Sequence, residues 1–173
     1  GARPGTVEVL ITGANRGIGL GLAQQLAGRG HRVHATARQP GEATELAALA
    51  AARDVRIHTL DVADDAACAA LARGLSGRRL DRVVHNAGID SGFIPFEATD
   101  LAAAQHIYDV NALGPLRLTR ALLPRLARGG VLVHVSSRLA SVTNADGLAA
   151  PYNMAKAALN MLRRTLDVEL RGR

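Results

Sequence analysis

Two side chains that could exchange protons with a substrate, Tyr152 and Lys156, stand four residues apart in the stretch PYNMAKAALN. On a helix this spacing puts them on one face. A tyrosine phenol ordinarily has a pKa of about 10 and is a poor acid–base at neutral pH. A nearby cation favours the phenolate and lowers the pKa of the phenol. A phenol tuned in this way can give a proton to a carbonyl oxygen or take one from an alcohol.

Lys156 is the only lysine among the 21 Lys and Arg side chains of the chain. An ammonium group is a compact point charge with three donors, whereas a guanidinium is a broad planar fork. The sequence therefore indicates a site at which arginine would not serve. The alternative is that a solvated lysine and a half-buried tyrosine stand near each other by coincidence.

A glycine-rich stretch, TGANRGIG (Thr12–Gly19), joins an apolar strand pattern to a helical pattern. Glycines at such a junction permit a tight turn and let the backbone approach a pyrophosphate, while the helix N-terminus supplies free N–H groups. Because the stretch follows the first strand of a β-α-β unit, it predicts dinucleotide binding. The alternative is that Gly13, Gly17 and Gly19 only allow a close helix–strand contact.

Short apolar strands alternate with helices along the chain. Strands are expected at Val7–Thr12, His31–Arg38, Val55–Val62, Asp81–Gly88 and Gly129–Ser137. Helices are expected at Gly17–Gly30, Gly41–Asp54, Asp64–Gly77, about Asp100–Ala127, and from Pro151 onward. This alternation predicts a doubly wound parallel sheet, the Rossmann fold, with three α/β/α layers in one dinucleotide-binding domain over residues 1–173. In such folds ligands bind beyond the carboxyl ends of the strands.

The composition excludes several classes of protein. The net charge is +6, but the arginines are scattered rather than clustered, so we expect no nucleic-acid partner. One cysteine, Cys68, excludes an internal disulfide and a multi-cysteine zinc site, and the histidines show no metal spacing. No apolar run approaches the ~20 residues that span a bilayer, and no signal peptide is visible, so we expect a soluble cytoplasmic protein.

Five short motifs, in order, resemble the pattern of the short-chain dehydrogenase/reductase family. They are TGANRGIG, NAG (Asn86–Gly88), Asn111, the pair Ser136-Ser137 and YNMAK (Tyr152–Lys156). The stretches NALGPLRLTRALLP and SSRLASV are most similar to the C-factor-like subgroup. The family normally continues after its last helix here with another strand, a substrate-covering loop and a final strand, and we expect the sequence to lack these elements.

The resemblance implies an NADP-dependent oxidoreductase that acts on a small carbonyl or alcohol substrate. It implies that Tyr152 is the acid–base, that Lys156 also holds the nicotinamide ribose, and that Ser137 bonds the substrate oxygen. Asn111 would hold a water that relays protons to the lysine, although a helix-capping or kink role is the alternative. The gap from Ser137 to Tyr152 is about two residues longer than the commonest family spacing.

The resemblance also implies a set of cofactor-binding residues and a homo-oligomer formed through the helix at Asp100–Ala127 and the last helix. The cofactor set is Gly13, Asn15, Arg16, Gly17, Ile18, Gly19, Arg38, Asp61, Val62, Asn86, Ala87, Gly88, Tyr152 and Lys156. Asp61 and Val62 match the family position that contacts adenine, with a helix N-cap as the alternative for Asp61. A cofactor-binding sensor or signalling protein with little turnover is the alternative function.

The end of the second strand predicts a preference for NADP over NAD. NAD-binding folds of this kind usually place an acidic residue there to bond the ribose 2′-OH. Here Ala37 stands at that position and Arg38 follows it, so no carboxylate at the strand end opposes a 2′-phosphate. A guanidinium can grip a phosphate bidentately, and Arg16 adds a second cation. The alternative is that both arginines are solvated products of the compositional bias.

Overall fold

The computed structural model describes residues 5–145 and 147–172. Its centre is a parallel sheet in the order β3-β2-β1-β4-β5. The strands are β1 (Glu8–Ile11), β2 (Arg32–Ala37), β3 (Val55–Thr59), β4 (Leu80–His85) and β5 (Leu126–His134). The chain moves outward from β1 to one edge, then crosses back to β4 and β5. This order confirms the predicted doubly wound Rossmann fold.

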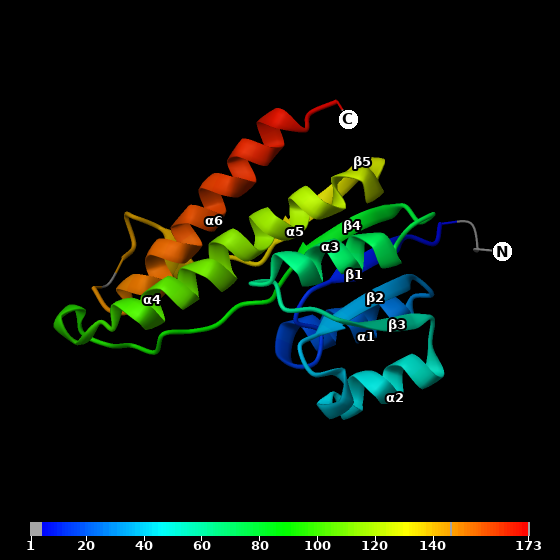
Figure 1. Ribbon diagram of the computed structural model, residues 1–173, viewed down its shortest axis with the longest axis horizontal. Helices are drawn as coiled ribbons and strands as arrows, with labels where there is room; N and C mark the ends of the chain where they lie inside the picture. Colours follow the sequence, from blue (N-terminus) through cyan, green and yellow to red (C-terminus); the bar gives the residue numbers. More distant parts are fainter. Residues whose placement is uncertain (1–4, 146, 173) are drawn as a thin grey trace.

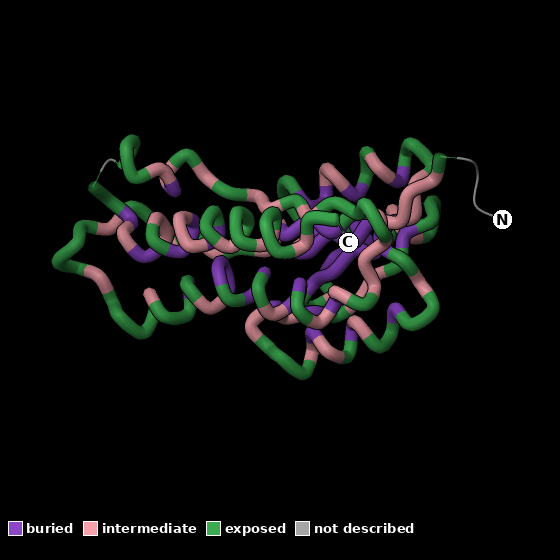
Figure 2. Tube along the Cα trace, turned by 90° about the horizontal axis from the view of Figure 1, so that it is seen from above, coloured by how far each residue is buried: buried purple, intermediate pink, exposed green. Residues whose placement is uncertain are grey.

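Helices cover both faces of the sheet (Figure 1). They are α1 (Gly17–Gly28), α2 (Thr44–Ala52), α3 (Asp65–Gly74), α4 (Leu101–Tyr108), α5 (Gly114–Leu122) and α6 (Ala150–Glu169). One apolar cluster joins α1 and α2 to β1, β2 and β3. A second joins α3 and α5 to the opposite face of β1 and β4. The buried residues accordingly run through the sheet, between two more exposed helical layers (Figure 2).

The prediction of one long helix at Asp100–Ala127 is wrong in two respects, its continuity and its C-terminal end. The structure divides it into α4, a π-helical turn at Asp109–Leu113, and α5, followed by a short 3₁₀ turn at Leu123–Arg125. Pro124 lies in that turn and has no N–H to donate to an α-helical bond. The strand β5 therefore begins at Leu126 rather than Gly129.

Several strands also end earlier than expected. β3 ends at Thr59, so Asp61 and Val62 lie in the turn that follows it rather than within the strand. β1 and β4 end at Ile11 and His85, so Thr12 and Asn86 lie just beyond the ends of these strands. These shorter strands put the polar residues of the motifs on the connecting loops at one end of the sheet.

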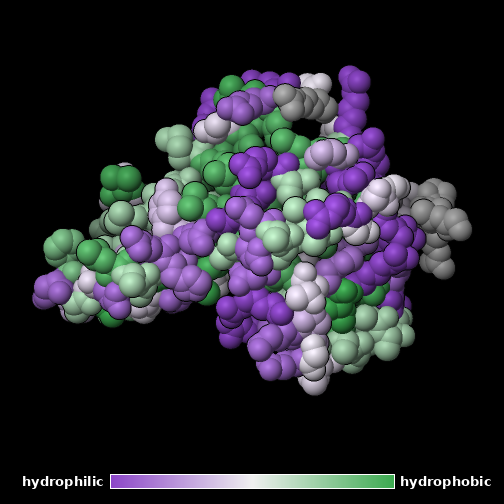
Figure 3. Space-filling model, in the orientation of Figure 1, coloured by the Kyte–Doolittle hydropathy of each residue, from purple (hydrophilic) through white to green (hydrophobic). Residues whose placement is uncertain are grey.

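A surface groove lies away from those loops. A groove of about 760 Å³ runs between the edge strand β5 and the C-terminal half of α6, and its apolar lining includes Leu126, Leu132, Leu166 and Leu170. Figure 3 shows the hydrophobic side chains exposed between these two elements. Among the described residues, the structure contains no helix with the length and apolar character needed to cross a membrane.

Candidate active site

The loop after β1 owes its shape to three glycines. Gly13 and Gly17 have φ angles of +62° and +56°, a left-handed conformation that side chains disfavour. A Cβ at Gly13 would lie 3.0 Å from the Cα of Ala87. A Cβ at Gly19 would collide with the carbonyl oxygen of Gly13 and lie 2.5 Å from Asn86 Nδ2. The backbone therefore turns tightly from β1 into the N-terminus of α1, pressed against the end of β4.

Thr12 and Asn86 hold that loop in place. Asn86 Nδ2 donates to the carbonyl oxygens of Thr12 and Gly13, each at 3.0 Å. Thr12 Oγ1 accepts the N–H groups of Asn86 and Ala87 at 3.0 and 2.9 Å. The sequence predicted a cofactor-binding role for Asn86 but none for Thr12, which it gave only as the first residue of the glycine-rich stretch. These four bonds join the end of β1 to the end of β4.

A cavity of about 540 Å³ opens beyond these strand ends, a volume typical of small-molecule sites. Eleven of the predicted cofactor-binding residues line it: Gly13, Asn15, Arg16, Gly17, Ile18, Arg38, Asp61, Val62, Asn86, Ala87 and Gly88. Gly19, Tyr152 and Lys156 are not part of its lining. Gly19 instead allows the close contact between α1 and the loop before it.

Two carboxylates that the sequence did not indicate for this site also line the cavity. Glu42 and Glu45 follow β2 in the segment that leads into α2, and both are exposed. They share the cavity with Arg16 and Arg38. The strand end itself lacks an acid, as expected, but the cavity as a whole does not. Their position depends on how the chain turns at Pro40, which sequence spacing does not determine.

The structure excludes the helix N-cap role that was the alternative for Asp61. Asp61 Oδ1 accepts the N–H of Ala63 at 2.9 Å, a local turn contact. The N-cap of α3 is Asp64, whose carboxylate accepts the N–H groups of Ala66 and Ala67. Asp61 is therefore not the helix cap, and it is one of the residues that line the cavity.

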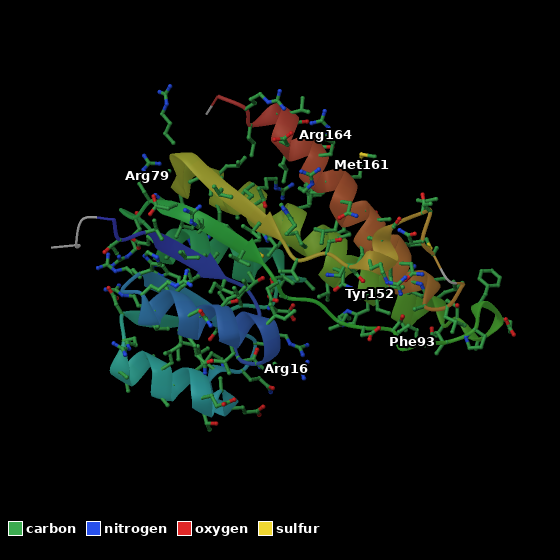
Figure 4. All side chains as sticks on the ribbon, turned by 180° about the vertical axis from the view of Figure 1, so that it is seen from behind. Arg16, Arg79, Phe93, Tyr152, Met161 and Arg164 are labelled. Atoms are coloured by element: carbon green, nitrogen blue, oxygen red, sulfur yellow. The ribbon has the colours of Figure 1, made fainter. Side chains whose placement is uncertain are left out.

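Tyr152 and Lys156 lie on the first turns of α6. Lys156 Nζ is 5.6 Å from the centre of the Tyr152 ring and donates to the carbonyl oxygen of Val135 at 2.9 Å. Lys156 is buried, and burial lowers the pKa of its ammonium group. Figure 4 shows Tyr152 on α6 and Arg16 on the loop after β1, both on the side of the sheet toward which the strands point.

Asn111 lies in the π-helical turn between α4 and α5 and is fully buried. Its side chain pairs with the backbone of Ile89, accepting the N–H at 2.9 Å and donating to the carbonyl at 2.8 Å. Pro115 has no N–H, so it cannot close a regular helical bond to the Asn111 carbonyl four residues earlier. The helix is therefore interrupted beside Gly114-Pro115 by a widened, π-helical turn that contains Asn111.

Gly88 lies next to both Asn111 and Lys156 at the wall of the cavity. A Cβ at Gly88 would lie 3.0 Å from Asn111 Oδ1 and 3.6 Å from Lys156 Nζ. Gly88 itself lines the cavity. The candidate proton-transfer groups thus border the same wall as the candidate dinucleotide-binding residues, although they come from opposite ends of the sequence.

The two serines after β5 have separate contacts. Ser137 Oγ accepts the N–H of Leu139 at 3.2 Å as the cap of a short 3₁₀ turn. Ser136 Oγ donates to Asn160 Oδ1 on α6 at 2.7 Å. A catalytic role for Ser137 stays a prediction, because these contacts anchor the segment without assigning either hydroxyl to a substrate.

Residues 8–173 match the family described as short chain dehydrogenase. The chain belongs to this family. Bovine retinol dehydrogenase 8 is a relative with 38% identity over 173 residues, which cover 94% of this chain and 54% of the relative. The C-signal protein of Myxococcus xanthus is 41% identical over 95 residues, covering 53% of this chain and 57% of that protein. The second likeness agrees with the C-factor-like resemblance noted above.

Solved short-chain dehydrogenase structures superpose closely on this one. A carbonyl reductase from Pseudomonas aeruginosa, determined in complex with NADP, is 37% identical with a TM-score of 0.88. The match covers 96% of this chain and 77% of that chain. The chain thus spans little more than half the length of the two curated relatives and about three quarters of the solved reductase.

Proposed function

We propose that this short-chain dehydrogenase is an NADP(H)-dependent oxidoreductase acting on a carbonyl or alcohol group, with Tyr152 as the acid–base. The observation that carries the proposal is the buried Lys156 ammonium, 5.6 Å from the Tyr152 ring and beside the Gly88 wall of the cavity. That ammonium is fixed in place by its burial and by one bond to the Val135 carbonyl. When bound, the nicotinamide cofactor would supply the hydride chemistry.

The residues of the cavity fit a dinucleotide. The glycine loop turns tightly against Ala87 and Asn86, where a Cβ at Gly13 or Gly19 would clash, and it leads directly into the N-terminus of α1. Free N–H groups and the positive end of a helix dipole suit a pyrophosphate. The Lys156 ammonium has three donors, and the Val135 carbonyl engages one of them. The remaining two donors are available for ribose hydroxyls.

Proton supply to Tyr152 would run past Lys156 toward Asn111. The three groups come from α6 and the π-helical turn, and Gly88 lies between the last two. Asn111 is fixed by two bonds to Ile89, so its position does not depend on a ligand. Ser137 would orient the substrate oxygen, in line with its place after β5.

The reductase function and a signalling function are distinguished by turnover. The similarity to a protein named C-signal favours a cofactor-binding protein with little turnover as the second candidate. Steady-state oxidation of NADPH against a panel of ketones and aldehydes decides between them. Saturable turnover with any member of the panel supports the oxidoreductase. Tight NADPH binding without turnover across the panel supports the second candidate instead.

The preference for NADPH over NADH is a further part of the proposal. Arg16 and Arg38 line the cavity with no carboxylate at the strand end, although Glu42 and Glu45 lie in the same cavity and weaken its positive potential. One charge-assisted contact is worth about 1.5–3 kcal/mol, or roughly tenfold to a hundredfold in affinity. Titrations of NADPH and NADH against the parent and Arg38→Asp test this. Equal affinities in the parent, or an unchanged NADPH affinity in the variant, would show the preference to be wrong.

A homo-oligomer completes the proposal. α4 and α6 pack together, and both carry large apolar side chains that face solvent. Leu101, Met154 and Met161 are 76%, 64% and 67% exposed. Figure 4 shows Met161 projecting outward from α6. Exposed apolar side chains gathered on neighbouring helices are typical of an interaction surface.

A further inference from the structure

Arg117 of α5 binds three different segments of the chain at once. Its Nε donates to Asp65 Oδ1 in the first turn of α3 at 2.6 Å. Its Nη1 donates to the Val62 carbonyl at 2.8 Å, and its Nη2 donates to Asp109 Oδ1 at 2.8 Å. The Arg117 side chain is only 16% exposed, so its charge depends on these partners for compensation.

Two of the three segments also form the wall of the strand-end cavity. Val62, from the turn after β3, and Val110, which follows Asp109 in the π-helical turn, both line it. Val62 also packs directly on Gly114, where an added Cβ would lie 2.8 Å from Val62 Cγ2. The turn after β3 is therefore packed against the first residue of α5, which directly follows the π-helical turn, and Arg117 bonds to both turns.

We infer that Arg117 is a positioning residue that holds the Val62 wall where the cavity receives the adenosine end of a dinucleotide. The inference rests on the proposed function, because it requires the cavity to bind that ligand. No part of Arg117 lines the cavity itself, so it acts through Val62 and Asp109. Among the described residues, the one other hydrogen-bonding contact of the Val62 carbonyl is with the thiol of Cys68 at 4.0 Å, which cannot replace a charged donor.

The geometry requires arginine at this position. The planar guanidinium presents its N–H groups in fixed directions, and here Nε, Nη1 and Nη2 each serve a separate acceptor. A lysine ammonium is a single point and cannot reach acceptors on three segments in the same way. Arg117→Lys therefore keeps the charge and most of the stem while it loses the tie between segments. Arg120, one turn further along α5 and exposed, is a matched control.

The test measures the affinity of the full chain for NADPH and for 2′,5′-ADP, which carries the adenosine end without the nicotinamide. Isothermal titration is run on the parent, Arg117→Lys, Arg117→Met and Arg120→Met, well below the melting temperature of each. We expect both Arg117 variants to bind both ligands about tenfold more weakly, because the Val62 carbonyl loses the charged donor that fixes its position. Arg120→Met should bind both ligands as the parent does.

The outcomes separate this inference from the proposed function. Parental affinity for 2′,5′-ADP in Arg117→Lys and Arg117→Met, whatever their melting temperatures, would overturn the positioning role. A lower melting temperature with unchanged affinity would mark Arg117 as a structural residue only. If the parent binds neither NADPH nor 2′,5′-ADP, the proposed function itself is wrong.

Discussion

Replacing Gly19 by alanine should disrupt the glycine loop, whereas the same change at Gly21 should not. Both residues lie in α1. A Cβ at Gly19 would collide with the Gly13 carbonyl and lie 2.5 Å from Asn86 Nδ2, while a Cβ at Gly21 would meet no atom within 4 Å. The two substitutions therefore add the same methyl group to the same helix and differ only in what it meets.

The expected magnitudes follow from that difference. An alanine in a helix is about 0.5–1 kcal/mol more favourable than a glycine, and this gain applies to both variants. Overpacking against groups that cannot move aside costs about 1–3 kcal/mol, and it applies only to Gly19→Ala. We expect Gly21→Ala to melt a few degrees above the parent and Gly19→Ala below it, since each kcal/mol shifts the melting temperature by about 2–4 °C at this size.

NADPH binding should also change when a Cβ at Gly19 displaces its neighbours. To accept a Cβ at Gly19, the Gly13 carbonyl or the Asn86 side chain must shift, and both border the cavity. We expect at least about tenfold weaker NADPH binding in Gly19→Ala and parental binding in Gly21→Ala. Calorimetric melting and NADPH titration of the two variants check this. Matching melting temperatures and matching affinities for the pair would refute the reasoning.

Three further predictions follow from the site and the core. Lys156→Arg should lose nearly as much turnover as Lys156→Ala, because a planar fork does not replace a point charge in a buried position; steady-state kinetics check this, and a fully active arginine variant would contradict it. Burial lowers the pKa of His85 from 6.5 to about 3. As pH falls from about 6.5 toward 3, this histidine therefore becomes protonated in the unfolded chain but stays neutral in the folded chain. The free energy of unfolding then falls by up to about 1.4 kcal/mol per pH unit. Denaturant unfolding across that range should show a shallower loss in His85→Asn, and an identical slope would argue against the buried histidine as a cause. Sedimentation at micromolar concentration should show a homo-oligomer that Met161→Lys weakens, whereas a monomeric parent would count against the exposed faces of α4 and α6 as an interface.

Much of the fold could be predicted because its signals are local. Apolar strands such as Val9–Ile11 are short, and glycine or polar residues bound them, so their alternation with helices already indicated a parallel sheet. The sequence left a helix-capping or kink role beside Gly114-Pro115 only as the alternative for Asn111. It did not indicate a π-helical turn, because that form depends on the side chain of Asn111 pairing with Ile89 across the fold.

The candidate site was predicted where its residues follow a motif and missed where they depend on packing. The glycine loop and the NAG segment line the cavity as expected. No role was predicted for Thr12, Glu42, Glu45 or Arg117. Each owes its place to a contact or a turn made by the folded chain, and Arg117 reaches partners as far away in sequence as Val62. The spacing of residues within one segment does not predict such contacts between distant segments.

The most direct test of the proposed reaction is the turnover of Tyr152→Phe. The substitution removes the phenolic proton and keeps the ring that lies 5.6 Å from Lys156. General acid–base catalysis contributes about 10²–10⁴-fold, so NADPH oxidation with a carbonyl substrate that the parent reduces should fall by at least about 10². NADPH binding, measured on the same samples, should stay near the parental value. A Tyr152→Phe variant that binds NADPH and turns over at the parental rate would contradict the assignment of Tyr152 as the acid–base.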